Sequence, residues 1–147
     1  MNIRKFRESD IDALIHIWLS GSSGSHSFID ASYWHSKKEA MATTYLPASN
    51  TYVLEEDGEP LGFISMVDTY LAALFVDPAR QSSGCGTQLL NHVKSECEQI
   101  HLNVYQKNTR AVQFYLHNGF TIERSGRDDE TGEDEYRMTW EKQRESS

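Results

Sequence analysis

The feature that most constrains the fold of this chain is an apolar run that leads into a glycine-containing loop. The run from Tyr70 to Val76 is almost wholly apolar and ends at Asp77-Pro78, which is typical of a strand buried on both faces of a sheet. The loop Gly84-Cys85-Gly86-Thr87 then opens a helix expected to end near Glu98. Glycines let the backbone approach a ligand closely, and the first amides of a helix are free and favour anions. This segment therefore predicts an anion site that fits a pyrophosphate.

Two common phosphate-binding loops do not match this segment. A nucleoside triphosphate loop needs Lys-Ser or Lys-Thr after its last glycine, and neither follows Gly86. A dinucleotide loop needs a third glycine, where this chain has Leu89, and an acidic residue at a strand end about 20 residues later, which is missing. ATP, GTP and NAD are thus disfavoured, and Gln81, Gly84 and Gly86 remain as a Gln-x-x-Gly-x-Gly pattern.

The rest of the chain alternates between helical and strand patterns, which predicts a mixed α and β class. A first helix is expected to begin at Ser9, which heads a capping box with Asp12, and to end at Gly21 before a loop that reaches Ser25. The other expected elements are a helix from Asp30 to Tyr45 stopped by Pro47, a hairpin of strands Thr51 to Glu55 and Leu61 to Val67 around Asp57-Gly58, a strand from Ile100 to Tyr105, a helix from Thr109 to His117, and a strand pair, Thr121 to Ser125 and Tyr136 to Trp140. The acidic segment from Asp128 to Asp134 is interpreted as a solvated turn.

Composition and charge limit the classes of partner. The chain has 147 residues with a formal net charge of -8 and 14 scattered Lys and Arg residues. Nucleic-acid binding relies on clustered cations, so no nucleic-acid partner is expected and a basic acceptor is favoured. No apolar run approaches the ~20 residues needed to cross a bilayer, so no membrane association is expected.

Length and cysteine content give the expected organisation of the chain. We expect one domain over residues 1–141, followed by a polar tail over residues 142–147, in a monomer or a homodimer. The two cysteines, Cys85 and Cys97, occur in a chain whose N-terminus runs directly into charged residues, without the pattern of a secretory signal. Reduced thiols and a cytoplasmic location are the expectation.

A second motif follows the strand that ends at Tyr105. Asn108 begins a helix that carries Ala111 and the pair Phe114-Tyr115 before Gly119-Phe120. Together with the Gln-x-x-Gly-x-Gly pattern, in this order and with a strand between them, this motif resembles the GNAT (Gcn5-related) N-acetyltransferases. The resemblance is strong over residues 50–125. The stretches around Trp34, Glu55 to Gly58, Leu61 to Phe63 and Val104 to Asn108 are similar to small bacterial YiaC-type acetyltransferases.

This resemblance implies a fold and a reaction. The implied GNAT fold has a mixed central sheet of about seven strands flanked by about four helices, in an α/β (α+β) arrangement. Its two parallel central strands, here Tyr70 to Val76 and Ile100 to Tyr105, splay apart to admit the pantetheine arm of acetyl-CoA. The implied reaction is direct attack of a primary amine on acetyl-CoA, with a protein lysine or N-terminal amine as the acceptor. A small amine, polyamine or amino acid acceptor, a catalytically silent acyl-CoA sensor, and a tRNA-directed toxin, which the acidic charge disfavours, are the alternatives.

The resemblance also assigns roles to residues. Tyr115 is the implied general acid, and the Leu74 amide is placed to polarise the thioester carbonyl. The implied cofactor-binding residues are Leu74, Phe75, Val76, Gln81, Ser82, Ser83, Gly84, Cys85, Gly86, Thr87, Asn108, Ala111, Phe114 and Tyr115. Ser82 and Ser83 depart from the family, which often has Arg or Lys there, and Arg80 is a possible substitute for that charge. Tyr70, His26, Phe28, Trp34 and Asp68 are the candidate acceptor-binding residues, with His26 and Asp68 as candidate bases. No metal site is expected.

Overall fold

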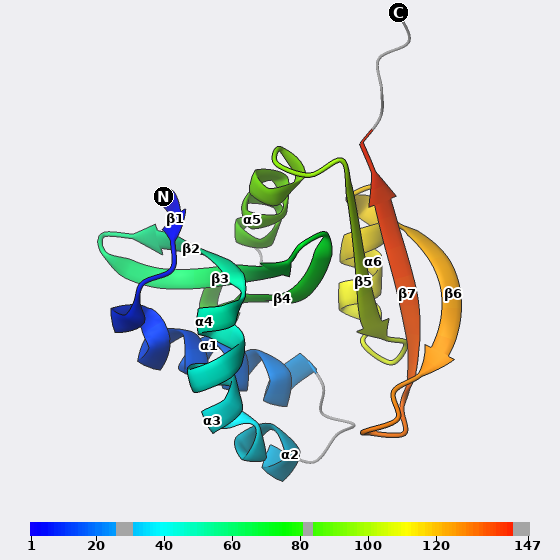
Figure 1. Cartoon of the computed structure of the whole chain (residues 1–147), viewed down its shortest axis with the longest axis horizontal. Coiled ribbons are helices and arrows are strands. Elements are labelled where there is room, and N and C mark those ends of the chain that lie inside the picture. The colour runs from blue at the N-terminus through cyan, green and yellow to red at the C-terminus, as the bar shows by residue number, and fades with distance from the viewer. Residues whose placement is uncertain (26–30, 81–83, 143–147) are drawn as a thin grey trace, which may run out of the picture.

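The computed structural model describes residues 1–25, 31–80 and 84–142, which form one mixed sheet with helices on both faces (Figure 1). The order of the seven strands in the sheet is β1-β2-β3-β4-β5-β7-β6. The strands are β1 (Asn2–Lys5), β2 (Asn50–Glu56), β3 (Glu59–Val67), β4 (Tyr70–Val76), β5 (Gln99–Tyr105), β6 (Thr121–Arg127) and β7 (Asp134–Glu141). The helices are α1 (Ile11–Ser25), α2 (Ala31–Ser36), α3 (Lys38–Ala40), α4 (Leu46–Ala48), α5 (Cys85–Lys94) and α6 (Thr109–His117). Within these ranges, no helix combines the length and the apolar character needed to cross a membrane.

Each face of the sheet has its own hydrophobic cluster. Side chains of α5 and α6, including Leu89, Leu90 and Val112, pack on one face with Ile100 of β5. On the other face, α1, α2 and α4 pack against β2 and β3 around Phe63. Strand β4 lies at the centre of the sheet and contributes Leu71 and Val76 to the first cluster and Ala73 to the second. The mixed sheet with helices on both faces confirms the predicted α/β class.

The hairpin between β2 and β3 forms as its sequence predicts. Asp57 and Gly58 connect the strands and both have positive φ, 52° and 81°. A two-residue turn of this kind matches the right-handed twist of the paired strands, and glycine adopts it at little cost. The short turn between β3 and β4 also contains a positive φ, 54° at Asp68.

The first helix differs from its prediction at both ends. A 3-10 turn, Glu8–Asp10, precedes α1, and Asp10 rather than Ser9 accepts the free amide, from Arg7 N at 2.8 Å. At the other end, the helix continues through Gly21 to Ser25, so the loop predicted there is wrong. A Cβ at Gly21 would lie 2.7 Å from Phe75 Cδ1 on β4. Glycine is therefore used at this position for close packing of α1 on the sheet, and the helix does not end there.

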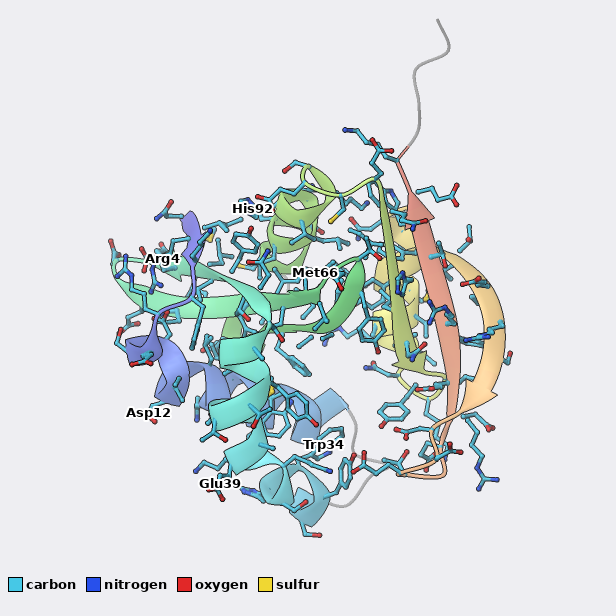
Figure 2. All side chains as sticks on the ribbon, viewed as in Figure 1. Arg4, Asp12, Trp34, Glu39, Met66 and His92 are labelled. Atoms are coloured by element: carbon cyan, nitrogen blue, oxygen red, sulfur yellow. The ribbon has the colours of Figure 1, made fainter. Side chains whose placement is uncertain are left out.

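The single helix predicted from Asp30 to Tyr45 is divided into several short helices. After α2, the chain turns at Lys37 into α3, a π-helical turn (Met41–Tyr45) and then α4, which contains Pro47. Pro47 therefore lies at the start of α4 and does not stop the stretch. Trp34 of α2 sits in this helical layer, edge-on to Trp18 of α1 with 6.1 Å between ring centroids (Figure 2).

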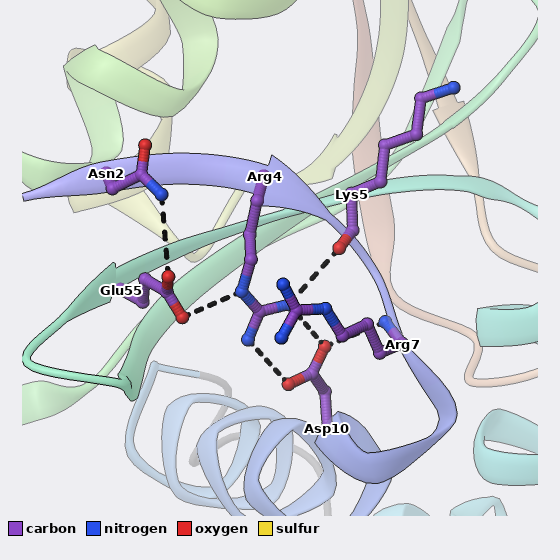
Figure 3. Close-up of polar contacts among 6 residues, drawn as sticks. All are labelled: Asn2, Arg4, Lys5, Arg7, Asp10 and Glu55. Atoms are coloured by element: carbon purple, nitrogen blue, oxygen red, sulfur yellow. Dashed lines mark hydrogen bonds and ion pairs between the residues drawn. The ribbon is translucent and has the colours of Figure 1, made fainter.

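Strand β1 has no counterpart among the predicted elements. It pairs antiparallel with β2, where Ile3 is opposite Leu54. Arg4 of β1 connects three segments: its guanidinium donates two 2.8 Å hydrogen bonds to Asp10, and its Nε donates one of 2.7 Å to Glu55 (Figure 3). These contacts lower the pKa of the Asp10 carboxyl, chiefly through the hydrogen bond from Arg4. The ion pair thus fixes the start of α1 against the edge of the sheet.

Helix α5 and the last two strands also differ slightly from their predicted bounds. The helix ends at Lys94, four residues before the predicted end at Glu98, because a turn leads there into β5. The final strands extend two residues further on the sides that face their connecting loop. Of the predicted tail, Lys142 follows β7 directly, and residues 143–147 lie outside the described part of the chain.

The central feature of the sheet is the divergence of β4 and β5. These neighbouring strands are parallel, and among the described residues they pair at one position, Tyr70 with His101. Both strands continue well beyond this point, β4 to Val76 and β5 to Tyr105, and over this length β4 stays paired with β3 and β5 with β7. The predicted splay of these two strands is therefore confirmed, and it opens the sheet next to α6 (Figure 1).

Candidate active site

A cavity of about 710 Å³ occupies the opening between β4 and β5. Its walls come from both diverging strands, from the start of α5, from α6 and from the loop between β6 and β7. The residues that line it are Gly21, Tyr70–Val76, residues 102–105, Gly84, Gly86, Thr87, Asn108, Arg110, Ala111, Phe114, Tyr115, Asp128 and Glu135. Most of the residues that the sequence assigns to the donor site therefore share one cavity.

The start of α5 is built as an anion cradle. Gly84 is the N-cap residue and has a φ of 82°, a conformation that side-chain-bearing residues rarely adopt. Two residues later, a Cβ on Gly86 would lie 3.3 Å from Phe114 Cζ, so the backbone of α5 approaches α6 closely. The free amides of the first turn point to the end of the helix, where a pyrophosphate binds favourably. The residues present thus fit the diphosphate of coenzyme A.

Three of the predicted loop residues, Gln81, Ser82 and Ser83, lie outside the described residues. Of the other loop residues, Cys85 does not line the cavity, since its side chain is buried in the core below α5. Arg110 does line it, although the sequence analysis does not select it. Its position beside Asn108 in the second motif is the signal that could have identified it. Arg110, at the start of α6, brings a cation to the wall of the cavity.

Helix α6 positions its residues through a side-chain cap. The Asn108 side-chain oxygen accepts a 3.3 Å hydrogen bond from the Ala111 amide, which satisfies one of the free donors at the start of the helix. This cap fixes the helix so that Phe114 and Tyr115, neighbours in sequence, both line the cavity. Asn108 therefore has a clear structural role in addition to its position in the cavity wall.

Tyr115 is nearly buried, with 8% of its surface exposed. Its ring packs edge-on against Phe114 and Phe120, with centroids 5.3 and 5.4 Å away. Burial raises the pKa of the Tyr115 hydroxyl, and the nearby Tyr70 raises it further. Among the described residues, none hydrogen-bonds this hydroxyl. Tyr115 thus presents a protonated phenol to the cavity, available for an interaction with a ligand.

The predicted acceptor-side residues are only partly brought together. Tyr70 lines the cavity, and the centroid of its ring lies 5.6 Å from that of His101. Trp34 packs in the helical layer away from the cavity, and Asp68 lies exposed in the β3–β4 turn. His26 and Phe28 lie outside the described residues.

The acidic segment between β6 and β7 is more than a solvated turn, contrary to its interpretation from sequence. Asp128 accepts a 2.5 Å hydrogen bond from the Tyr105 hydroxyl, and both residues line the cavity. Further along the segment, Glu130 forms an ion pair with Lys37, which ties it to the turn after α2. Charged side chains in this segment are therefore held in place by partners distant in sequence.

Two carboxylates from this region, Asp128 and Glu135, line the cavity and differ in their electrostatics. Burial disfavours charge on Asp128, but hydrogen bonds from Tyr105, from the Glu130 amide and from Thr131 together lower its pKa. Burial raises the pKa of Glu135, and repulsion by Asp128 adds to that rise. Within the ranges the structure describes, no group of three or more His, Cys, Asp or Glu residues is arranged to hold a metal ion.

Comparisons with known proteins agree with this geometry. Residues 47–122 match the family model described as "Acetyltransferase (GNAT) domain". The chain is 36% identical to peptidyl-lysine N-acetyltransferase YiaC of Escherichia coli, over 94% of this chain and 95% of that protein. It is 32% identical to peptidyl-lysine N-acetyltransferase YjaB of Salmonella typhimurium, over 83% and 84% of the two chains.

A solved structure supports the same assignment. The solution structure of the apo form of YjaB from Escherichia coli superposes with a TM-score of 0.84 at 27% identity, covering 95% of this chain and 96% of that one. Acetyl-CoA is the acetyl donor of the GNAT enzymes, and the cavity and glycine cradle described above fit it. This chain belongs to the GNAT family of N-acetyltransferases.

Proposed function

We propose that this enzyme acetylates the side-chain amine of lysine residues in proteins. The observation that carries the proposal is the presence of two carboxylates, Asp128 and Glu135, in the cavity between the diverging strands. A lysine side chain arrives as an ammonium ion on a long flexible stem, and negative charge in a partly desolvated site attracts it. The two relatives named above as peptidyl-lysine N-acetyltransferases support the same acceptor class.

In the donor half of the proposed site, the backbone of α5 and of β4 provides most of the contacts. In this proposal the first-turn amides of α5, from Gly84 onward, hold the pyrophosphate, with Arg110 adding positive charge nearby. The predicted contributions of Gln81, Ser82 and Ser83 belong to the same loop. The exposed edge of β4 beyond Tyr70, at Leu74, Phe75 and Val76, binds the pantetheine arm. Acetyl-CoA supplies a thioester whose carbonyl carbon is attacked by the amine.

The residues around the splay then perform the transfer. The Leu74 amide donates a hydrogen bond to the carbonyl oxygen, where negative charge develops. Tyr115 gives its phenolic proton to the departing thiolate of coenzyme A, because an unassisted thiolate is a poorer leaving group than a thiol. The raised pKa of Tyr115 keeps that proton in place at neutral pH until charge appears on the sulfur. Tyr70 lines the entry on the acceptor side.

Thiol release from acetyl-CoA is the direct test. The enzyme would be assayed with lysine peptides whose N-termini are blocked, with peptides that have a free N-terminus and no lysine, and with polyamines. We expect release with the lysine peptides, together with a mass gain of one acetyl group on the lysine. Release with only the free N-termini or only the polyamines would overturn the lysine assignment.

Both cysteines are free thiols, which supports the accompanying proposal that the enzyme works in the cytoplasm.

A further inference from the structure

The cavity is approached by functional groups from opposite faces of the sheet. Leu102 and Val104 of β5 belong to the hydrophobic cluster that contains Tyr115, whereas Tyr105 packs against the other cluster. This alternation is what a strand requires, because successive side chains point to opposite faces. Tyr115 therefore reaches the splay from the α6 face, and Tyr105 lies on the α1 face.

Glu135 lies on the same face as Tyr105. The two residues are direct partners in the antiparallel pairing of β5 with β7, and direct partners have their side chains on one face. Glu135 also lines the cavity, and its charge acts on Tyr70, which in turn acts on Tyr115. Glu135, Tyr70 and Tyr115 therefore line one cavity at the opening in the sheet.

The carboxylates of Glu135 and Asp128 differ in their hydrogen bonding. Among the described residues, none hydrogen-bonds or pairs with the Glu135 carboxylate, whereas the Tyr105 hydroxyl and the Glu130 amide both hydrogen-bond Asp128. The charged and titratable groups that face Glu135 are Asp128 and Asp129 of the β6–β7 loop, Tyr105 on β5, Tyr70 on β4, and Arg137 on β7, whose guanidinium is bound by Glu123 at 3.2 Å. Glu135 is partly buried, and among the described residues no cation lies within ion-pair distance of its carboxylate, since Arg137 pairs with Glu123 instead.

We infer that Glu135 is the general base that takes a proton from the acceptor ammonium before it attacks, with Asp128 holding that ammonium in place. The inference rests on the proposed acetylation of an amine and adds the residue that prepares it. A lysine side chain with a pKa near 10.4 is protonated at neutral pH and has no lone pair for attack. A carboxylate that is buried and unpaired is a better base than one stabilised by hydrogen bonds, which separates Glu135 from Asp128.

The protons balance in this scheme. The ammonium gives one proton to the Glu135 carboxylate, and the free amine forms the new C–N bond. As the C–S bond breaks, Tyr115 protonates the sulfur, and the second proton lost by the nitrogen restores the Tyr115 hydroxyl. Glu135 then releases its proton to water. The sum is one ammonium and one thioester converted to one amide, one thiol and one proton.

The test is the pH dependence of Glu135→Gln with a blocked lysine peptide. Loss of the base leaves only the small fraction of lysine that is already neutral, so we expect kcat/KM to fall about 100-fold at pH 7. That deficit should shrink about tenfold for each pH unit and be gone near pH 9, because each unit supplies ten times more free amine. The Kd for acetyl-CoA should be unchanged, which shows that the variant is folded. Glu135→Asp should recover part of the activity at pH 7.

Asp134→Asn is the matched control, because Asp134 is the exposed neighbour of Glu135 and does not line the cavity. It removes the same charge and should keep the wild-type pH profile. A Glu135→Gln enzyme whose kcat/KM follows the wild-type profile, or which raises only the KM for the peptide, would overturn the role as a base. Failure of the wild-type enzyme to acetylate any lysine peptide would instead overturn the proposed function, so the two failures are distinguishable.

Discussion

The hydroxyl of Tyr105 on β5 donates a 2.5 Å hydrogen bond to the carboxylate of Asp128 in the β6–β7 loop. The bond joins two residues that both line the cavity, and it holds the acidic loop against the diverging end of β5. Burial, followed by this hydrogen bond, raises the pKa of Tyr105, while the hydrogen bonds that Asp128 accepts outweigh its burial and lower the pKa of its carboxyl. The loop is thereby held with its negative charge inside the cavity.

Tyr105→Phe should weaken acceptor binding while sparing the donor. Without the hydroxyl, Asp128 loses a hydrogen bond of the charge-assisted kind, worth roughly 1.5–3 kcal/mol. We expect the KM for a lysine peptide to rise about tenfold and the KM for acetyl-CoA to stay within about twofold of the wild-type value. Lys107→Met is the control, since it breaks the exposed ion pair of Lys107 with Glu133 in the same loop. A Lys107 variant with the same defect would show that loop mobility, and not the hydrogen bond, sets the KM.

Tyr115→Phe should lower kcat about 100-fold with little effect on the Kd for acetyl-CoA, because the ring and its packing are kept while the transferable proton is removed. Steady-state kinetics and calorimetry with acetyl-CoA measure the two quantities. A variant that turns over at the wild-type rate would exclude Tyr115 as the acid.

Gly86→Val should abolish binding of acetyl-CoA. A Cβ at this position already meets Phe114 Cζ at 3.3 Å, so a branched side chain must displace α6 or enter the cavity. Calorimetric titration with coenzyme A is the measurement. Gly126→Val provides the matched control, because Gly126 lies on exposed β6 and a Cβ there meets nothing within 4 Å. Binding to Gly86→Val with unchanged affinity would contradict the cradle.

Gly21→Ala should destabilise the protein although alanine is the better helix former by about 1 kcal/mol. The added Cβ would lie 2.7 Å from Phe75 Cδ1, a separation that forces the aromatic ring or the helix to move. Overpacking of this kind costs about 1–3 kcal/mol, which outweighs the gain in helix propensity. Urea unfolding followed by circular dichroism measures the net change. An increase in the free energy of unfolding would mean that the ring moves freely.

Asp10→Asn should destabilise the protein by about 3 kcal/mol at pH 7, because it leaves the part-buried guanidinium of Arg4 without its main partner. The folded-state pKa of Asp10 is lowered, so its stabilising effect is present above the unfolded-state pKa and is lost as the pH falls through the folded-state pKa. The difference between variant and wild type should therefore narrow as unfolding is measured at increasingly acidic pH. Asp12→Asn, at an exposed position in α1, should change stability by less than about 1 kcal/mol. If the difference in unfolding free energy between Asp10→Asn and the wild type stays the same at acidic pH, the destabilisation does not depend on the charge of Asp10.

The parts of this structure that sequence predicts are those determined by neighbouring residues. The β2–β3 hairpin depends on Asp57 and Gly58, and the strand-loop-helix that forms the donor cradle depends on residues within about one element of one another. The divergence of β4 and β5 is predicted from the family resemblance, through motifs that flank these strands.

The parts that sequence does not predict depend on distant partners. Strand β1 is short and is stabilised by β2, about 50 residues later, through Arg4 and Glu55. Helix α1 passes through Gly21 because Phe75 packs there, which outweighs the usual tendency of glycine to end a helix. Asp128 lies in the acidic segment and Glu135 directly follows it, and their place in the cavity depends on the bond of Asp128 to Tyr105 and on the pairing of Glu135 with β5.

The single pairing position between β4 and β5 also affects the stability of the enzyme against unfolding. Strands β1 to β4 pair in sequence along their lengths, as do strands β5 to β7, with a bulge in three of the ladders. The two groups are joined to each other by one pairing position among the described residues. In the binding mode proposed above, a donor molecule in the gap contacts both groups, so its binding energy adds to the resistance of the whole protein to heat and proteolysis. The folded enzyme should therefore be longer-lived when acetyl-CoA is abundant. When the donor is scarce, the reaction stops and the enzyme itself becomes more prone to unfolding and proteolysis.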